Sequence, residues 1–169
     1  MVKFDDRNQA GRVPAAAGAT AGAAGESGGP RAGPPGFELL EHTADVGIRA
    51  RGATPEEAFE QATRGLADVL GVWRPGEGER VEIALDGDDQ GGLLVDWLNE
   101  VLYLHEVRQA ALGGVRVDRL ADRRVEGSVA VVPLGDRPPE GISVKAATYH
   151  HLRVEPEDGG WLVEVYLDV

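Results

Sequence analysis

Cysteine is absent from the 169 residues of this sequence, so disulfides, thiolate metal ligands and cysteine nucleophiles are all excluded. Lysine is nearly absent too, and Lys3 and Lys145 are the only two. No apolar run is long enough to span a bilayer, and residues 1–14 lack the apolar core of a signal peptide. We therefore expect a cytoplasmic protein that does not bind membranes.

Positive charge is also in short supply. The formal net charge is -12 and the isoelectric point is near 4.7. A field of this sign repels phosphate backbones, so direct, stand-alone nucleic-acid binding is disfavoured. An acidic surface suits a basic protein partner or bound cations, and it is equally consistent with a surface that only keeps the protein in solution.

Large apolar side chains are scarce in the first part of the chain. Residues 10–36 consist mainly of Ala, Gly and Pro, which bury too little surface to offset the entropy lost on ordering. We predict a disordered N-terminal extension over residues 1–36 and one folded domain over residues 37–169.

The periodicity of the folded part predicts an α+β domain in which two main amphipathic helices pack on an antiparallel-rich β-sheet. Thr54, Pro55 and Glu57 form a capping box with proline at the first helical position, and Gly71 is a natural helix end. The expected helices span residues 54–70 and 93–102. The expected strands span residues 37–40, 46–51, 80–85, 115–120, 123–132, 143–148, 152–154 and 161–167.

Several familiar sites are excluded by spacing. The acidic loop from Asp86 resembles an EF-hand at first, but Trp97 stands where a bidentate carboxylate is required. The histidines lack zinc-site spacing, and His150 and His151 would point to opposite sides of an extended strand. Ser128 and Ser143 lie in strand-like segments without a nucleophile elbow. The four histidines are His42, His105, His150 and His151.

Four segments carry polar and charged side chains that packing of the core does not require. They read EHTADVG at residues 41–47, LLVDWLNE at 93–100, KAATYH at 145–150 and LDV at 167–169. In this order and at these separations they resemble the archease family, and the resemblance covers residues 37–169. The departures are conservative: Ala147 replaces a bulkier residue, and Val169 replaces the commoner isoleucine.

The resemblance implies a function. Archeases assist the RtcB-type RNA ligase of tRNA splicing and RNA repair, which joins 3′-phosphate or cyclic-phosphate ends to a 5′-hydroxyl. They promote guanylylation of the ligase and multiple turnover, and they are not catalysts themselves. The family's metal site maps onto Asp45, Asp168 and the carboxylate of Val169.

Converging carboxylates suit a hard divalent cation, Ca²⁺ or Mg²⁺. Asp96, Glu100 and Lys145 are candidates for contacting the ligase or for extending this polar patch. A solvated helix face and an ordinary strand charge explain these three residues equally well.

Two other functions remain open at this point. One is a general chaperone or adaptor for nucleic-acid-modifying proteins, in which a metal only stabilises the fold. The other is a metal-dependent hydrolase, which the carboxylates support weakly.

Overall fold

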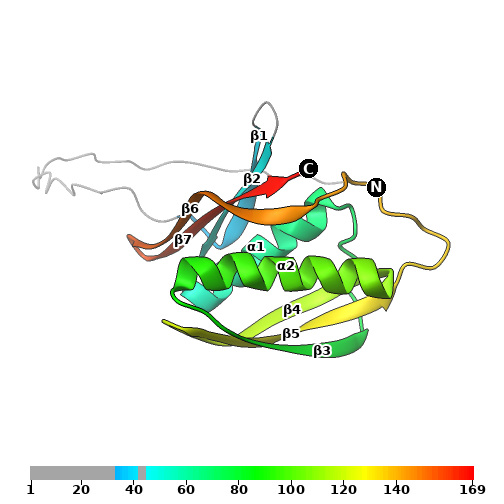
Figure 1. The fold of residues 1–169 in the computed structure, drawn as a ribbon, viewed down its shortest axis with the longest axis horizontal. Helices are drawn as coiled ribbons and strands as arrows, with labels where there is room; N and C mark the ends of the chain where they lie inside the picture. Colours follow the sequence, from blue (N-terminus) through cyan, green and yellow to red (C-terminus); the bar gives the residue numbers. More distant parts are fainter. Residues whose placement is uncertain (1–32, 42–44) are drawn as a thin grey trace, which may run out of the picture.

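The computed structural model describes residues 33–41 and 45–169. Two helices and seven strands form in the chain order β1, β2, α1, β3, α2, β4, β5, β6, β7 (Figure 1). The helices are α1 (Pro55–Val69) and α2 (Gln90–Arg108). The strands are β1 (Gly36–Glu41), β2 (Asp45–Gly52), β3 (Glu79–Asp86), β4 (Ala110–Ala121), β5 (Arg124–Pro133), β6 (Ala146–Glu157) and β7 (Gly160–Asp168).

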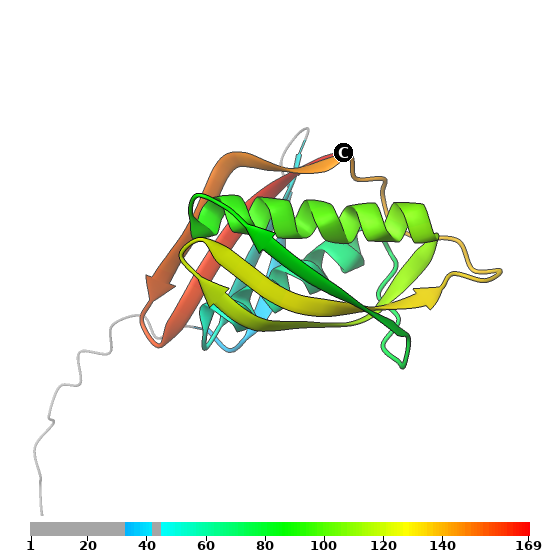
Figure 2. The same cartoon turned by 60° about the horizontal axis from the view of Figure 1, so that its bottom comes forward.

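The strands divide between two antiparallel sheets. One has the order β1-β2-β7-β6 and the other the order β3-β5-β4. Both helices contact strands of both sheets, and Figures 1 and 2 show them between the two sheets. The predicted α+β class is thus confirmed, with two sheets in place of the single sheet that periodicity suggests.

Helix α1 begins and ends where the sequence indicates. The Thr54 hydroxyl accepts a hydrogen bond from the amide of Glu57, and Pro55 occupies the first turn. The Glu57 carboxylate accepts from the amide of Ala53, one residue before the position that a standard capping box uses. Gly71 follows the helix with a φ of +66°, the left-handed conformation that glycine adopts without strain.

Helix α2 is more enclosed than an ordinary amphipathic helix. Because sheets flank it on two sides, apolar residues occupy most of its circumference, and Trp97 is fully buried. The indole of Trp97 donates to the Thr63 hydroxyl, which itself donates to the Phe59 carbonyl. This buried chain of hydrogen bonds links α2 to α1.

Strand β6 differs most from expectation. The sequence pattern predicts separate strands over residues 143–148 and 152–154, yet one strand spans Ala146–Glu157 with a register shift between Thr148 and Arg153. His151 lies within the shift at a φ of +49°. A bulge of this kind interrupts alternation without ending a strand, so the sequence pattern looks like two strands.

Strand β7 is packed on both faces. The predicted core face of Trp161, Val163, Val165 and Leu167 packs in or against the apolar core. Strand β7 is also an inner strand of its sheet, paired with β2 on one edge and β6 on the other, and the residues of its other face are buried as well. Leu162, Glu164 and Tyr166 are buried there.

Over the described part of the chain, no helix is both long and apolar enough to cross a membrane. The predicted extension, residues 1–36, falls almost wholly outside the described residues, and its disorder stays a prediction.

Candidate metal site at the ends of strands β2 and β7

Asp45 and Asp168 are brought opposite each other by strand register. They are direct partners at the end of the antiparallel β2–β7 pair. Directly opposed residues project from the same face of a sheet, with Cβ atoms about 4.5–5.5 Å apart. The sequence places both residues at strand ends but does not show that they meet. The fold supplies that proximity.

Lys145 lies beside the same strand end. Its amide donates to the Asp168 carbonyl at 2.8 Å. Its ammonium donates to a Val169 main-chain oxygen at 3.0 Å and lies 3.7 Å from a carboxylate oxygen of Asp168. The last residues therefore already attract one cationic group. Both side chains of the ion pair are more than half exposed, so the pair is a weak one.

The donor set fits a hard cation. Carboxylate and main-chain oxygens are the ligands that Ca²⁺ and Mg²⁺ prefer. In residues 33–41 and 45–169, no three side chains of His, Cys, Asp or Glu gather closely enough to hold a metal. A metal site here would take Asp45 and Asp168 as side-chain ligands, with the Val169 carboxylate as a third ligand.

Asp96 and Glu100 lie on α2. Asp96 lines a pocket that is separate from the candidate metal site. Together with Asp89 and Tyr149 it lines an open pocket of ≈ 570 Å³ near the start of that helix. Asp96 is exposed and Glu100 half-buried. Within the described residues neither carboxylate has a hydrogen bond or ion pair. Lys145, by contrast, stands at the candidate metal site.

Asn99 is a positioning residue that sequence reasoning does not single out. Its side-chain oxygen accepts from the amide of Ala147 at 2.8 Å, and its side-chain nitrogen donates to the Ala147 carbonyl at 3.2 Å. This bidentate contact fixes α2 against β6, two residues from Lys145. The only signal in the sequence is an amide side chain within an apolar helix.

Another cluster lies on the far side of β7 from the main core. The rings of His150 and His151 are 4.0 Å apart and each lies within 6 Å of the Tyr166 ring. The expectation that the two histidines point to opposite sides assumes an extended strand, and the positive φ of His151 removes that condition. Nearby, Glu164 is only 7% exposed and accepts from the Arg49 guanidinium at 2.9 Å. That hydrogen bond raises the pKa of Arg49.

Comparisons with known proteins now place the chain in a family. Residues 37–169 match the model of the archease protein family. The protein archease of Methanosarcina mazei is 36% identical over 140 residues, covering 79% of this chain and 95% of that protein. The archease of Methanopyrus kandleri is 36% identical over 138 residues, covering 79% and 99%.

Solved structures agree. Protein 1598 of Methanobacterium thermoautotrophicum aligns with a TM-score of 0.62 and 31% identity, covering 79% of this chain and 99% of that one. A Thermotoga maritima archease, described as a possible chaperone, aligns with a TM-score of 0.56 at 23% identity, covering 78% and 96%, and supports the fold. The chain belongs to the archease family.

Proposed function

We propose that this protein is an accessory factor that activates an RtcB-type 3′-phosphate/5′-hydroxyl RNA ligase in tRNA splicing or RNA repair. It acts in the cytoplasm by promoting ligase guanylylation and multiple turnover. Family membership over residues 37–169, together with the cross-strand pairing of Asp45 and Asp168, carries the proposal. The sequence has no phosphate-binding loop or nucleophile elbow, which favours an activator over a catalyst.

The proposed metal ligands are Asp45, Asp168 and the carboxylate of Val169. A divalent cation, Ca²⁺ or Mg²⁺, would neutralise these groups and offer positive charge to oxygen atoms of the partner. The chain's own contribution is to hold the ligands in place through the β2–β7 register, which sets the two aspartates opposite each other. Lys145 donates a hydrogen bond to the last residue.

Calorimetry with CaCl₂ and MgCl₂ tests the metal site. Asp45→Ala and Asp168→Ala should each abolish measurable binding, because two ligands cannot replace three. One extra residue after Val169 should weaken binding by displacing the terminal carboxylate. Asp136→Ala, an exposed loop position, is the control with the same change of charge. Unchanged affinity in both aspartate variants would remove the site.

A radiolabelled GTP transfer assay on the cognate purified ligase tests the activity. We expect faster labelling of the ligase, faster multiple-turnover joining of a 3′-phosphate RNA to a 5′-hydroxyl RNA, and an effect at substoichiometric amounts. Asp45→Ala and Asp168→Ala should lose the stimulation while remaining folded. Equal rates with and without the protein would refute the proposal. Transfer of the radiolabel to this protein in place of the ligase would indicate that it is itself an enzyme.

A general chaperone or adaptor is the second candidate, because the Thermotoga maritima protein of similar fold is described as a possible chaperone. The two functions differ in the breadth of their partners. Affinity purification from the native cell should recover the ligase as the main partner if the first proposal holds. Recovery of many unrelated nucleic-acid-modifying proteins without a ligase would favour the chaperone.

A further inference from the structure

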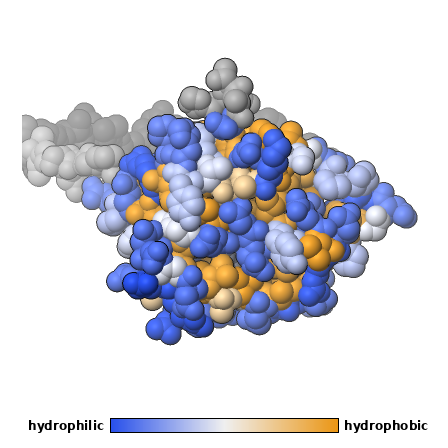
Figure 3. Space-filling view, in the orientation of Figure 1, coloured by the Kyte–Doolittle hydropathy of each residue, from blue (hydrophilic) through white to orange (hydrophobic). Residues whose placement is uncertain are grey.

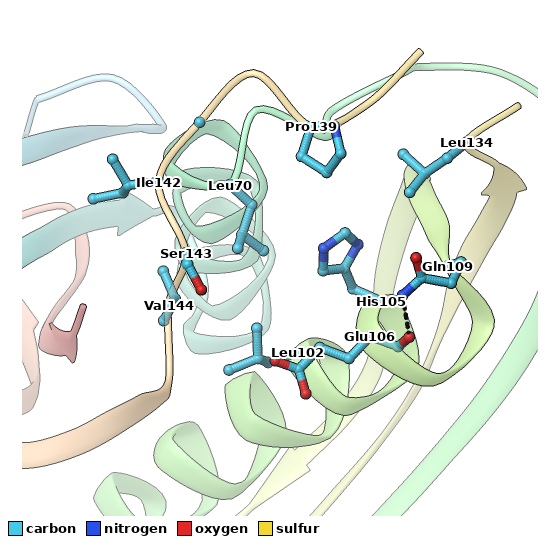
Figure 4. A pocket seen from close by; sticks show the side chains of 11 residues that line it. Leu70, Leu102, His105, Glu106, Gln109, Leu134, Pro139, Ile142, Ser143 and Val144 are labelled. Atoms are coloured by element: carbon cyan, nitrogen blue, oxygen red, sulfur yellow. Dashed lines mark hydrogen bonds between the residues drawn. The ribbon is translucent and has the colours of Figure 1, made fainter. Parts of the chain in front are cut away.

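A pocket of ≈ 370 Å³ lies between the C-terminal half of α2, the end of α1 and the β5–β6 loop, residues 134–145. Apolar side chains form most of its walls. His105 and Glu106 supply polar groups from α2, and Ser143 supplies one from the loop. Figure 4 shows the His105 ring projecting from the helix into the space between Leu70 and Leu134, below Pro139.

The loop over this pocket is fixed by hydrogen bonds to one arginine. The Arg74 guanidinium donates to the carbonyls of Leu134 at 2.9 Å, Arg137 at 2.8 Å and Pro138 at 3.5 Å. A charged donor that serves several carbonyls holds a loop more firmly than neutral hydrogen bonds do. One side of the pocket is therefore preformed.

Close backbone packing fixes the other side. The amides of Gly141 and Ile142 donate to the carbonyls of Leu70 and Val69 at 3.2 and 2.9 Å. A Cβ on Gly71 would overlap the Gly141 nitrogen, and a Cβ on Gly141 would overlap the Val69 oxygen. Only glycine allows this approach. The loop thus packs directly on the end of α1, and a ligand would not have to order it.

His105 presents a hydrogen-bond acceptor to the pocket. The residue is 9% exposed, and its Nδ1 lies 2.7 Å from the Ala110 carbonyl. A carbonyl only accepts, so Nδ1 carries the hydrogen and Nε2 of the neutral ring keeps its lone pair. No side chain of the described residues bonds to Nε2, and none of their fully buried nitrogens or oxygens lacks a partner. Nε2 is therefore open to the pocket.

The acceptors define the kind of group that fits. Nε2 of His105 and the carboxylate of Glu106 can both accept hydrogen bonds. Among the described residues, no group forms a hydrogen bond or ion pair with the Glu106 carboxylate. Leu70, Leu102 and Val144 offer apolar walls. A cationic head on an apolar stem matches this combination, which is the make-up of arginine and lysine side chains.

The surroundings of the pocket indicate a protein as the source of that side chain. Ile142, which lines the pocket, is 47% exposed, and Val107, one residue along α2 from Glu106, is 61% exposed. Exposed apolar residues beside a pocket that also carries polar groups are a feature of protein interfaces. The net charge of -12 attracts basic partners. Figure 3 shows hydrophobic residues interspersed with hydrophilic ones over one face of the molecule.

We propose that this pocket binds an arginine or lysine side chain of a basic partner protein, with its stem on the apolar walls and its head on His105 and Glu106. The site goes beyond the proposed ligase activation and does not require the partner to be the ligase. Its test uses peptides alone, so its failure is separate from failure of the proposed function.

The test is an NMR titration of the full-length protein with a short capped peptide that carries one central arginine between alanines. The matched peptide carries citrulline, which has the same shape without the charge. We expect saturable amide shifts at Leu102, Ala110 and Val144, with the citrulline peptide at least about tenfold weaker because it lacks the charge-assisted hydrogen bonds. Equal binding of both peptides, or no saturable shift, would overturn the proposal.

Variants locate the binding. Glu106→Gln should lower the affinity for the arginine peptide by about tenfold. His105→Phe removes the other acceptor and should lower that affinity at least as much. Glu82→Gln removes the same charge from an exposed position on β3 and should leave binding unchanged. If His105→Phe fails to fold, Glu106→Gln decides, because Glu106 is exposed. If Glu106→Gln and Glu82→Gln lowered the peptide affinity equally, the overall negative charge of the protein would explain binding. That result would contradict a specific pocket.

Discussion

Lys145 places an ammonium group within 3.0 Å of a Val169 oxygen and 3.7 Å of Asp168. A metal ion bound to the same oxygens would lie close to this ammonium group. The two positive charges would repel each other, and exposure to solvent weakens that repulsion. The lysine therefore competes with any cation that uses the same oxygens. It also holds the chain end in place, so the two effects of its removal oppose each other.

We expect competition to dominate, since the pair is largely exposed and orients the terminus only weakly. Lys145→Met should tighten Ca²⁺ binding by about fivefold, as seen by calorimetry at low salt. Arg119→Met, which removes a charge from an exposed position on β4, should change the affinity far less. Weaker binding in Lys145→Met would show instead that the ammonium acts by orienting the ligands.

At the scale of elements, Asn99 joins α2 to the backbone of β6 through two hydrogen bonds. Asn99→Ala removes both hydrogen bonds to Ala147 and leaves a part-buried amide and carbonyl without those partners. We expect a loss of about 1–3 kcal/mol in the free energy of unfolding, measured by urea denaturation. Tyr103→Ala changes a 55% exposed residue of the same helix and should cost under about 0.5 kcal/mol.

The junction between α1 and the β5–β6 loop gives a second prediction at this scale. Gly71→Ala combines a positive φ with a Cβ that meets backbone atoms of Gly141, so we expect it to cost more than about 2 kcal/mol. Gly135 has a φ of +58°, and a Cβ added there would meet nothing within 4 Å. Gly135→Ala should therefore cost only about 1 kcal/mol. Equal losses in denaturation midpoint would mean that backbone conformation alone explains both.

Local signals predict the elements well and their assembly poorly. Thr54, Pro55 and Gly71 define α1 because capping is a property of neighbouring residues. The bulge at His151 and the division into two sheets depend on contacts between distant strands, which periodicity does not contain. The same holds for the candidate sites. Family resemblance suggests Asp45 and Asp168, whereas the pocket around His105 is formed only when the β5–β6 loop packs against α1.

At the scale of the whole molecule, the family match and the apolar core both begin at the start of β1. Phe37 packs against that core, and the family model starts at the same residue. Removing residues 1–35 should consequently change the melting temperature by less than about 2 °C and leave ligase stimulation intact. Differential scanning calorimetry checks the first expectation. A large drop would mean that the extension packs on the domain.

The net charge of -12 is the other property that belongs to the whole chain. If a basic partner is drawn to it over a distance, stimulation of the ligase should weaken as salt rises, because about 0.15 M salt already screens charges beyond roughly 8 Å. Association rates measured by stopped flow at increasing NaCl would follow this directly. An association rate that does not change with salt would mean that the partner is recognised through short-range contacts alone.

The pairing of β2 with β7 joins residues 45–52 to residues 161–168, across nearly the whole domain. During synthesis on the ribosome, β2 emerges long before its central partner exists. Strands β4 and β5, which pair across a short hairpin, meet their neighbours at once. Pairing over long sequence separations is slow because the loop must close first. The β3-β5-β4 sheet should thus form during translation, while the sheet that carries Asp45 and Asp168 is completed only after the last strand has left the ribosome.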